Sequence, residues 1–274
     1  MSLLSTSACD TCPANTQLSQ MGINIDKFDR IIALAGNPNT GKSTVFNALT
    51  GLRQHTGNWP GKTVTRAEGG FEFQSIKYKI VDLPGTYSLL SASQDEEVAR
   101  NFILFGQPDC TIIVTDATAL ERNLNLVLQV LEITDKVVIA VNLMDEARRK
   151  GIEVDTRSLA RDLGVPAIPI VARTNEGMQT LLTTVAEVIE GQIKTAPFRI
   201  KGTDSYQKSV TQLAAQIELL LPDIPNARWL AIRLLDGDDR VQKALLTGEL
   251  AELVTGQNRA VTKFSSQISV AGRQ

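Results

Sequence analysis

The octapeptide GNPNTGKS, from Gly36 to Ser43, constrains the fold of this chain more than any other feature. It fits the pattern G-x-x-x-x-G-K-[S/T], follows the apolar run RIIALAG and precedes a helical pattern at 42–51. In such a strand–loop–helix unit, the glycines let backbone N–H groups surround a phosphate at the N-terminus of the helix. The sequence therefore predicts a phosphate-binding loop in an α/β fold.

Strand and helix patterns alternate beyond this loop. Several strand candidates are continuous Val/Ile/Leu runs, which is typical of strands covered on both faces. GGFEFQSIKYKIVDL is typical of two strands joined by a turn at Ser75-Ile76, so one edge of a mostly parallel, six-stranded sheet should be antiparallel. We expect strands at 30–36, 69–75, 77–83, 110–116, 136–142 and 166–171, and helices at 42–51, 94–105, 120–134, 156–163 and 175–190.

The pattern changes near Thr195-Ala196-Pro197. Apolar residues from Val210 to Leu221 recur at helical spacing and stop before Pro222, and NARWLAIRLL and DRVQKALLTGELAELV supply two more helices. No strand candidate follows, so this part should form a small helical domain. The expected organisation is a disordered tail at 1–28, a nucleotide-binding domain at 29–194, a helical domain at 195–262 and a second tail at 263–274.

Charge and composition exclude some classes of protein. Lys and Arg number 28 against 30 Asp and Glu, a net charge of −2, which gives no general electrostatic basis for nucleic-acid binding. No apolar run approaches the roughly 18 residues of a membrane span, and the first residues lack a secretory signal. We therefore expect the chain as given to be soluble and cytosolic.

The three cysteines indicate no disulfide framework. Cys110 opens the apolar run CTIIVTD and is expected to be a buried, apolar-like side chain. Cys9 and Cys12 form a C-x-x-C in a polar tail, where no second pair and no histidine lie nearby to complete a zinc site. A reduced, disordered tail is the favoured interpretation over a metal or redox site.

Two motifs predict the phosphate and metal contacts. Lys42 should reach the β- and γ-phosphates, and the Ser43 hydroxyl should hold Mg²⁺. VDLPG ends a strand, so Asp82 can orient a water on Mg²⁺ and the Gly85 N–H can meet a γ-phosphate. The predicted nucleotide contacts of the first loop are Gly36, Asn37, Asn39, Thr40, Gly41, Lys42, Ser43 and Thr44.

A third motif, NLMD from Asn142 to Asp145, predicts the choice of base. An aspartate can accept two hydrogen bonds from guanine N1–H and N2–H₂, whereas adenine would leave the carboxylate unsatisfied. Further along, VARTNEG can bring a backbone N–H from about Ala172 or Arg173 to guanine O6. The order of the motifs predicts GTP and GDP rather than ATP as ligands.

The loop HTGNWPGKTVT, from His55 to Thr65, can be neither a helix nor a central strand, because it holds Pro60 and two glycines. It lies where a segment can close over γ-phosphate and Mg²⁺, so Thr63 is the predicted metal ligand, with Gly61 and Lys62 beside it. A large aromatic residue on such a loop is usually exposed. Trp59 is then either buried or exposed according to the nucleotide, or fixed permanently on the surface.

Together, GNPNTGKSTVFNALTG, GNWPGKTV, DLPGTYSL, NLMD and RWLAIRLLDGD resemble the cytosolic N-terminal module of the ferrous iron transport protein B family over residues 30 to about 260. The Asn-Trp-Pro-Gly-x-Thr-Val run is the most specific of these. The resemblance implies a Ras-like P-loop GTPase domain and a helical domain that favours GDP retention. It also implies a fragment of a bacterial Fe²⁺ transporter, on the cytoplasmic face of the inner membrane, whose membrane-embedded permease domain is absent here. Small cytosolic accessory proteins of iron transport and a second copy of the chain are further possible partners.

Some positions depart from general GTPase patterns. Thr86 follows Gly85 where many GTPases have a water-positioning glutamine, so backbone amides of this pair would aim the water. The resemblance implies that family members with an asparagine at the position of Asn39 are activated by potassium, so Asn39 is a predicted K⁺ ligand. The alternative is that its side chain only forms hydrogen bonds within its own loop. Leu143 and Ala172-Arg173-Thr174 replace commoner residues at the base, so exchange should be fast. The predicted catalytic residues are Asn39, Lys42, Thr63, Gly85 and Thr86.

Three functions are compatible with these motifs. The first is a GTP-hydrolysing module that regulates a ferrous iron transporter. The second is a free-standing ribosome- or tRNA-associated GTPase, which would call for a basic, aromatic platform that 197–274 does not show. The third is a switch that binds GTP and barely hydrolyses it. Single-turnover hydrolysis separates the first from the third, and an RNA pull-down tests the second.

Overall fold

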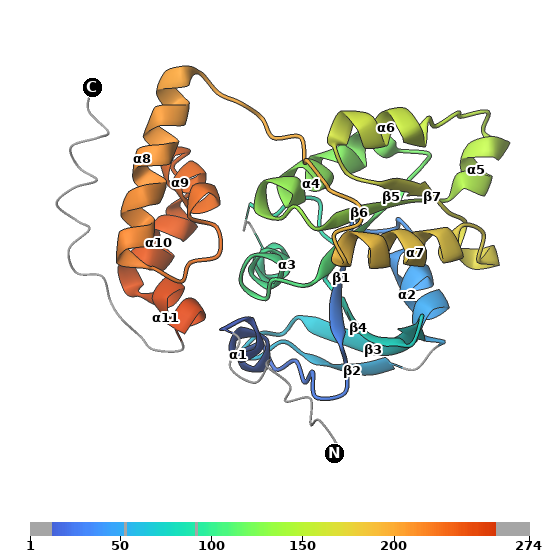
Figure 1. Cartoon of the computed structure of the whole chain (residues 1–274), viewed down its shortest axis with the longest axis horizontal. Coiled ribbons are helices and arrows are strands. Elements are labelled where there is room, and N and C mark those ends of the chain that lie inside the picture. Colours follow the sequence, from blue (N-terminus) through green and yellow to red (C-terminus); the bar gives the residue numbers. More distant parts are fainter. Residues whose placement is uncertain (1–12, 52–53, 91–92, 256–274) are drawn as a thin grey trace, which may run out of the picture. The chain divides into compact units, whose positions relative to one another are not determined.

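The computed structural model describes residues 13–51, 54–90 and 93–255 of the chain. These residues fall into two compact units: Met21–Arg199, and a second unit made of the described residues up to Gln20 and from Ile200 onward (Figure 1). Cys9, Cys12 and the predicted tail at 263–274 lie outside the described residues.

A seven-stranded sheet forms the centre of the first unit, in the order β2-β3-β4-β1-β5-β6-β7. Strand β1 runs parallel to β4 and β5, and β5, β6 and β7 are also parallel, whereas β2–β3 and β3–β4 are antiparallel. This confirms the predicted mostly parallel sheet with one antiparallel edge. The strands are β1 (Arg30–Gly36), β2 (Gln54–Asn58), β3 (Thr65–Phe73), β4 (Ile76–Asp82), β5 (Cys110–Asp116), β6 (Val137–Asn142) and β7 (Ala167–Pro169).

The sheet has one strand more than the six predicted, because β2 adds an edge to the antiparallel side. Its sequence QHTGN shows no apolar alternation, since an edge strand can leave its side chains in solvent. The turn between β3 and β4 falls at Gln74 and Ser75, one residue earlier than predicted, and both residues are left-handed, with φ of 51° and 62°. That backbone twist matches a tight two-residue hairpin.

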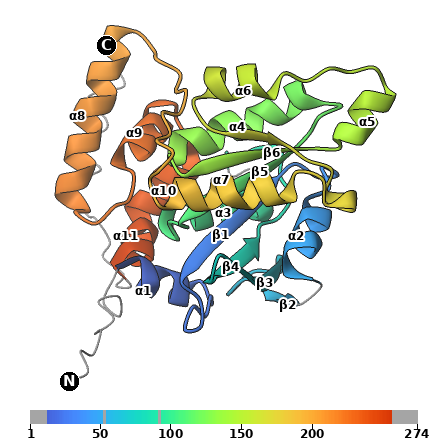
Figure 2. The same cartoon turned by 45° about the vertical axis from the view of Figure 1, so that its right-hand side comes forward.

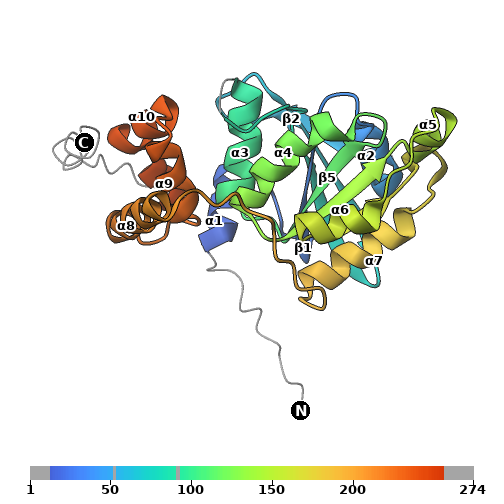
Figure 3. The same ribbon diagram turned by 90° about the horizontal axis from the view of Figure 1, so that it is seen from above.

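Helices cover both faces of the sheet. Residues of α2 and α7 pack with Ile32, Leu34 and Ile80 in one core cluster, while α3 and α4 lie over β1 and β5 on the other face (Figure 3). The phosphate loop leads from the end of β1 into α2 (Figure 2). The helices are α2 (Lys42–Thr50), α3 (Gln94–Phe105), α4 (Leu120–Ile133), α5 (Met144–Arg149), α6 (Thr156–Leu163), η1 (Ala172–Thr174) and α7 (Met178–Ile189).

The N-terminal part differs from the disordered tail expected over 1–28. Residues Pro13–Gln20 form α1, and the side chain of Ile23 is only 1% exposed. Gln17 Nε2 donates to the Val254 carbonyl within the second unit. The described part of this segment is therefore ordered by contacts that a polar composition does not reveal. Cys110 is buried as predicted.

The second unit is helical, as predicted. Its helices are α1, α8 (Asp204–Leu220), α9 (Ala227–Leu235), α10 (Asp239–Thr247) and α11 (Glu249–Thr255). The single helix predicted from DRVQKALLTGELAELV is divided in two, because Gly248 is left-handed at φ 81° and ends α10. Over residues 13–51, 54–90 and 93–255, no helix is both long and apolar enough to cross a membrane.

Candidate functional site

The phosphate loop needs its glycines for close backbone approach. A Cβ on Gly36 would lie 2.6 Å from the Val114 carbonyl oxygen, and a Cβ on Gly41 would lie 2.4 Å from Asn142 Nδ2. Gly41 also has a φ of 81°, which favours glycine. The Thr40 hydroxyl donates to the Asn37 carbonyl oxygen at 2.9 Å and braces the loop from within. The backbone is thus shaped as the sequence motif requires.

Lys42 and Asp82 form an ion pair at the ends of the loop and of β4. Both side chains are largely buried, at 12% and 16% exposure. Burial raises the pKa of Asp82 above its ordinary value, and the Lys42 ammonium opposes that shift. The structure therefore brings together the predicted phosphate-binding cation and the predicted metal-orienting carboxylate.

Ser43 and Thr44 occupy the first turn of α2, and both are exposed. No side chain caps the first N–H groups of this helix. These N–H groups form the partially positive end of the helix dipole. An anion placed there would find unpaired donors and a favourable field.

Asn142 joins the predicted base-binding loops to the phosphate loop. Its Nδ2 donates to the Thr40 carbonyl at 2.9 Å, and its Oδ1 accepts from the Ala172 N–H at 3.1 Å. Because the Ala172 N–H is used in this way, Arg173 supplies the next backbone donor along the chain. Asn142 is 2% exposed, so its buried side chain holds the two loops together.

Asp145 follows at the start of α5 and is 26% exposed. Arg173 Nη2 lies 3.0 Å from Asp145 Oδ2, and the Arg173 side chain is 75% exposed. The carboxylate predicted to read the base is therefore paired with an exposed cation from the neighbouring loop. A base that binds to Asp145 must compete with this ion pair.

Trp59 is buried, which contradicts the alternative that it is fixed permanently on the surface and agrees with the alternative that includes a buried state. Its side chain is 5% exposed, meets Phe102 of α3 edge-on with ring centroids 5.6 Å apart, and lies 5.5 Å from the Arg66 guanidinium. The indole Nε1–H has no hydrogen-bond partner among the described residues. A buried, unpaired donor of this kind costs about 1–3 kcal/mol.

The tip of the same loop is held on α3. Lys62 Nζ lies 2.8 Å from Glu97 Oε2, and the Thr63 hydroxyl donates to Gln94 Oε1 at 3.3 Å. Gly61, beside them, is exposed and left-handed at φ 68°. Gln94 and Glu97 were not among the predicted site residues; the only signal for them was the acidic start of the helix, QDEE.

Gly85 and Thr86 follow β4 and lie close to the phosphate loop. A Cβ on Gly85 would lie 3.5 Å from Pro38, and the Thr86 N–H donates to the Gly36 carbonyl at 3.4 Å. Thr86 is 5% exposed. In this state its amide is therefore bound to the loop.

The donor set fits Mg²⁺ held jointly with phosphate. In the part of the chain that the structure describes, no three His, Cys, Asp or Glu residues gather as they would in an all-protein metal site. Mg²⁺ in nucleotide sites instead uses one or two carboxylates together with substrate phosphates, and Asp82 and the exposed Ser43 hydroxyl supply such oxygen ligands. Asn37 Nδ2 is a further buried donor in the loop with no partner among the described residues.

The strand order and the loop after β1 place the first unit in the class of Ras-like P-loop GTPase domains. Comparison with known families extends this. Residues 30–185 match the model of ferrous iron transport protein B, and residues 206–268 match that of the FeoB cytosolic helical domain. The chain belongs to the ferrous iron transport protein B family.

Individual relatives agree with this. The Fe(2+) transporter FeoB of Escherichia coli K12 is 40% identical over 219 residues, which cover 76% of this chain and 27% of that protein. The structure of the cytosolic domain of L. pneumophila FeoB has a TM-score of 0.71 at 38% identity, covering 81% of this chain and 88% of that one. The cytosolic domain of the T. maritima FeoB iron transporter in its GMPPNP form has a TM-score of 0.71 at 32% identity, covering 89% and 93%. The chain spans less than a third of the length of the curated relatives it matches.

Proposed function

We propose that this chain is a GTP-binding and GTP-hydrolysing module that regulates ferrous iron uptake through a bacterial inner-membrane transporter, on the cytoplasmic side. The observation that carries the proposal is the hydrogen bonding of Asn142, which joins the predicted base loops to the phosphate loop. The GMPPNP form of the T. maritima domain supports a nucleoside triphosphate as ligand. The name of the E. coli relative supports ferrous iron as the cargo of the whole transporter.

On the phosphate side, the backbone from Gly36 to Thr44 surrounds the phosphates, and Lys42 contacts the β- and γ-phosphates. Lys42 must then exchange part of its contact with Asp82 for phosphate oxygens, which frees the Asp82 carboxylate. Ser43, Thr63 and, through a water, Asp82 hold Mg²⁺. When bound, the ion neutralises charge on the β- and γ-phosphates.

Thr63 contributes only after it leaves Gln94. Its hydroxyl donates to Gln94 in the described state, and the Lys62–Glu97 pair stabilises the same loop position. Gly61 has a left-handed backbone, and glycine can change between left- and right-handed conformations at little cost, as a moving loop tip requires. The γ-phosphate contacts of Thr63 and of the Gly85 N–H therefore distinguish GTP from GDP.

On the base side, Asp145 accepts hydrogen bonds from guanine, and the Arg173 backbone N–H is the donor proposed for O6, because the Ala172 N–H is bound to Asn142. The Arg173–Asp145 ion pair competes with the base, which supports the expectation of fast nucleotide exchange. An exposed pair of this kind contributes about 0.2–1 kcal/mol, so the competition lowers affinity by a few-fold at most.

Hydrolysis proceeds without a glutamine after Gly85. Asn39 is exposed and left-handed at φ 66°, and no hydrogen bond reaches its side chain within the described residues. Its amide oxygen is thus available to K⁺, which when bound supplies positive charge near the β–γ bridge. Gly85 and Thr86 would position the water through their amides once the Thr86 N–H leaves Gly36.

The domain at 195–262 is proposed to regulate GDP release, and the domain at 29–194 to carry the chemistry. The membrane-embedded permease domain of the full-length protein is the proposed partner on the same chain. Small cytosolic accessory proteins and a second copy of the chain are further proposed partners. Nucleic acid is not, in keeping with the net charge of −2.

Single-turnover hydrolysis of GTP with Mg²⁺ tests the proposal. The native protein should convert bound GTP to GDP, with GTP but not ATP displacing a fluorescent guanine nucleotide. Lys42→Ala should lose binding and turnover, whereas Lys150→Ala, on the exposed C-terminal end of α5, should keep both. Failure of GTP to bind would contradict the guanine assignment. Tight binding with no turnover in K⁺ would favour a switch that barely hydrolyses GTP.

A further inference from the structure

Residues 21–29 follow α1, contain turns at 21–22 and 26–27, and lie over the face of β3 and β4 that carries Glu68 and Lys79; we call this segment the strap and this face the outer face. At its end the strap joins the sheet: the Asp29 N–H donates to the Lys77 carbonyl and Asp29 Oδ2 accepts from the Lys77 N–H, both at 2.8 Å, next to the Arg30–Tyr78 pair of β1 and β4. Phe28 lies against Gly70, where an added Cβ would be 2.5 Å from the ring. Ile23 is 1% exposed. The strap is therefore a docked peptide rather than a loose tail.

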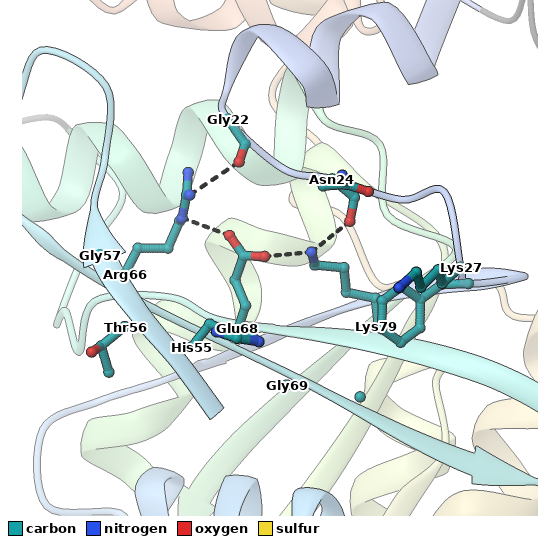
Figure 4. A pocket seen from close by; sticks show the side chains of 12 residues that line it. Gly22, Asn24, Lys27, His55, Thr56, Gly57, Arg66, Glu68, Gly69 and Lys79 are labelled. Carbon is teal, nitrogen blue, oxygen red and sulfur yellow. Dashed lines mark hydrogen bonds and ion pairs between the residues drawn. The ribbon is translucent and has the colours of Figure 1, made fainter. Parts of the chain in front are cut away.

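Charged side chains recognise the strap through its main-chain carbonyls. Arg66 Nη1 donates to the Met21 carbonyl at 2.6 Å and Arg66 Nη2 to the Gly22 carbonyl at 3.0 Å. Lys79 Nζ donates to the Asn24 carbonyl at 2.6 Å. Figure 4 shows the Arg66 side chain reaching the Gly22 carbonyl and the Lys79 side chain reaching the Asn24 carbonyl.

Glu68 lies between the two cations and pairs with both. The relative exposure of Glu68 is 8% and that of Lys79 is 6%, so this cluster is almost entirely withdrawn from water. Buried charges need partners, and one carboxylate cannot satisfy two cations. The three carbonyls of the strap complete the set, so strap and strands depend on each other.

Arg66 also connects the strap to the loop that carries Thr63. Its guanidinium lies 5.5 Å from the Trp59 ring, at the start of that loop. A movement of Trp59 removes this contact, and the Trp59 Nε1–H has no described partner to hold the ring in place. The Arg66 side chain therefore contacts both Trp59 of the loop and the main-chain carbonyls of the strap.

A cavity of about 730 Å³ adjoins the same cluster, lined among others by Lys27, His55, Arg66 and Lys79 (Figure 4). It gives the Arg66 side chain room to move. Water entering it can also solvate the cations when the carbonyls leave, which offsets part of the cost of exposing Ile23 on release.

We propose that the outer face of β2–β4 is a docking surface for the strap whose occupancy depends on the bound nucleotide, with Arg66 linking Trp59 to the strap. This rests on the proposed GTP-dependent movement of the loop. The strap is docked while the loop is held on α3 by Gln94 and Glu97, and it is released when Thr63 engages a nucleoside triphosphate. Release would free the stretch of chain between α1 and β1.

Limited digestion with trypsin tests the proposal, because Lys27 lies inside the strap and cleavage needs an undocked, extended backbone. The Lys27–Phe28 cut is followed by mass in the intact protein with Mg²⁺ and either GDP or GMPPNP. We expect cleavage at least about threefold faster with GMPPNP. Arg66→Gln should be cleaved fast and equally with both nucleotides, and the matched Arg161→Gln, whose exposed side chain pairs with exposed Asp162, should behave as the native protein.

Gly70→Ala provides a second test that removes no charge. Its methyl group would displace Phe28, so cleavage with GDP should rise toward the GMPPNP rate even if Arg66→Gln fails to fold. Nucleotide binding is measured on the same samples. Equal cleavage of the native protein with both nucleotides bound overturns the strap proposal alone. Absence of binding overturns the proposed function and the strap proposal with it.

Discussion

Lys62 Nζ lies 2.8 Å from Glu97 Oε2, and this ion pair joins the loop that carries Thr63 to the first turn of α3. The two side chains are 27% and 12% exposed, so solvent screens the pair less than it would on an open surface. The neighbouring Thr63–Gln94 hydrogen bond acts in the same direction. Both contacts therefore stabilise the described loop position, which Thr63 must leave in the proposed GTP-bound state.

Glu97→Gln should consequently shift the balance toward GMPPNP. A partly screened ion pair stabilises the described loop position by about 1 kcal/mol. Its removal should therefore raise the ratio of GMPPNP affinity to GDP affinity about two- to fivefold. Competitive binding against a fluorescent guanine nucleotide measures the ratio. Glu72→Gln, on the exposed part of β3, is the control and should leave it unchanged. An unchanged ratio in Glu97→Gln would show that the pair does not oppose closure.

Trp59 should report this movement directly. The chain has two tryptophans, so Trp229→Phe leaves Trp59 as the single indole emitter. Its present surroundings, Phe102 and Arg66, should change when the loop leaves α3, and emission with GDP should differ from emission with GMPPNP. Identical spectra with both nucleotides bound would favour a tryptophan that stays in place.

How far sequence alone predicted the molecule depends on the kind of contact. The phosphate loop and the strands after it were predicted because their patterns are local, and Asn142 was found because its motif follows a buried strand. The strand β2 was missed because QHTGN has no apolar alternation. The strap was missed because Arg66 and Lys79 bind main-chain carbonyls, which carry no residue-type signal. Gln94 and Glu97 were missed because their partners are distant in sequence.

Base choice should depend on Asp145. Asp145→Asn removes a charged acceptor for guanine N1–H and N2–H₂ and should weaken GTP binding by at least about tenfold, since such a bond contributes roughly 1.5–3 kcal/mol. Binding of xanthosine triphosphate should partly recover, because its base presents an acceptor there. Arg173→Ala is the informative companion, because removing the competing cation should leave GTP affinity equal or raise it. Unaltered GTP binding in Asp145→Asn would contradict the assignment of this carboxylate.

Cys110 should be chemically inert while the chain is folded. Burial raises the pKa of Cys110 to about 12, so almost no thiolate exists at pH 8.5. Because the pKa of Cys110 is higher in the folded chain than in the unfolded chain, the protonated thiol stabilises the fold at pH values below the unfolded pKa. This contribution to the free energy of unfolding is lost as pH rises from about 9 to about 12. Alkylation with iodoacetamide at pH 8.5, read by peptide mass, should modify Cys110 only in denaturant. Rapid native modification would show that this strand opens.

Potassium should accelerate hydrolysis through Asn39. The alternative, that Asn39 serves only its own loop, predicts a hydrogen bond from its side chain, and none reaches it within the described residues. An exposed amide oxygen on a left-handed residue of the phosphate loop is instead available to a monovalent cation.

Charge develops at the β–γ bridge in the transition state, and one well-placed electrostatic partner there changes the rate by about 10²-fold or more. Hydrolysis should thus be at least about tenfold faster in KCl than in NaCl at equal ionic strength. Asn39→Ala should lose the difference while still binding GDP, because its contact forms only with the bridge and not with the base. Equal rates in the two salts for the native protein would exclude a potassium-assisted mechanism.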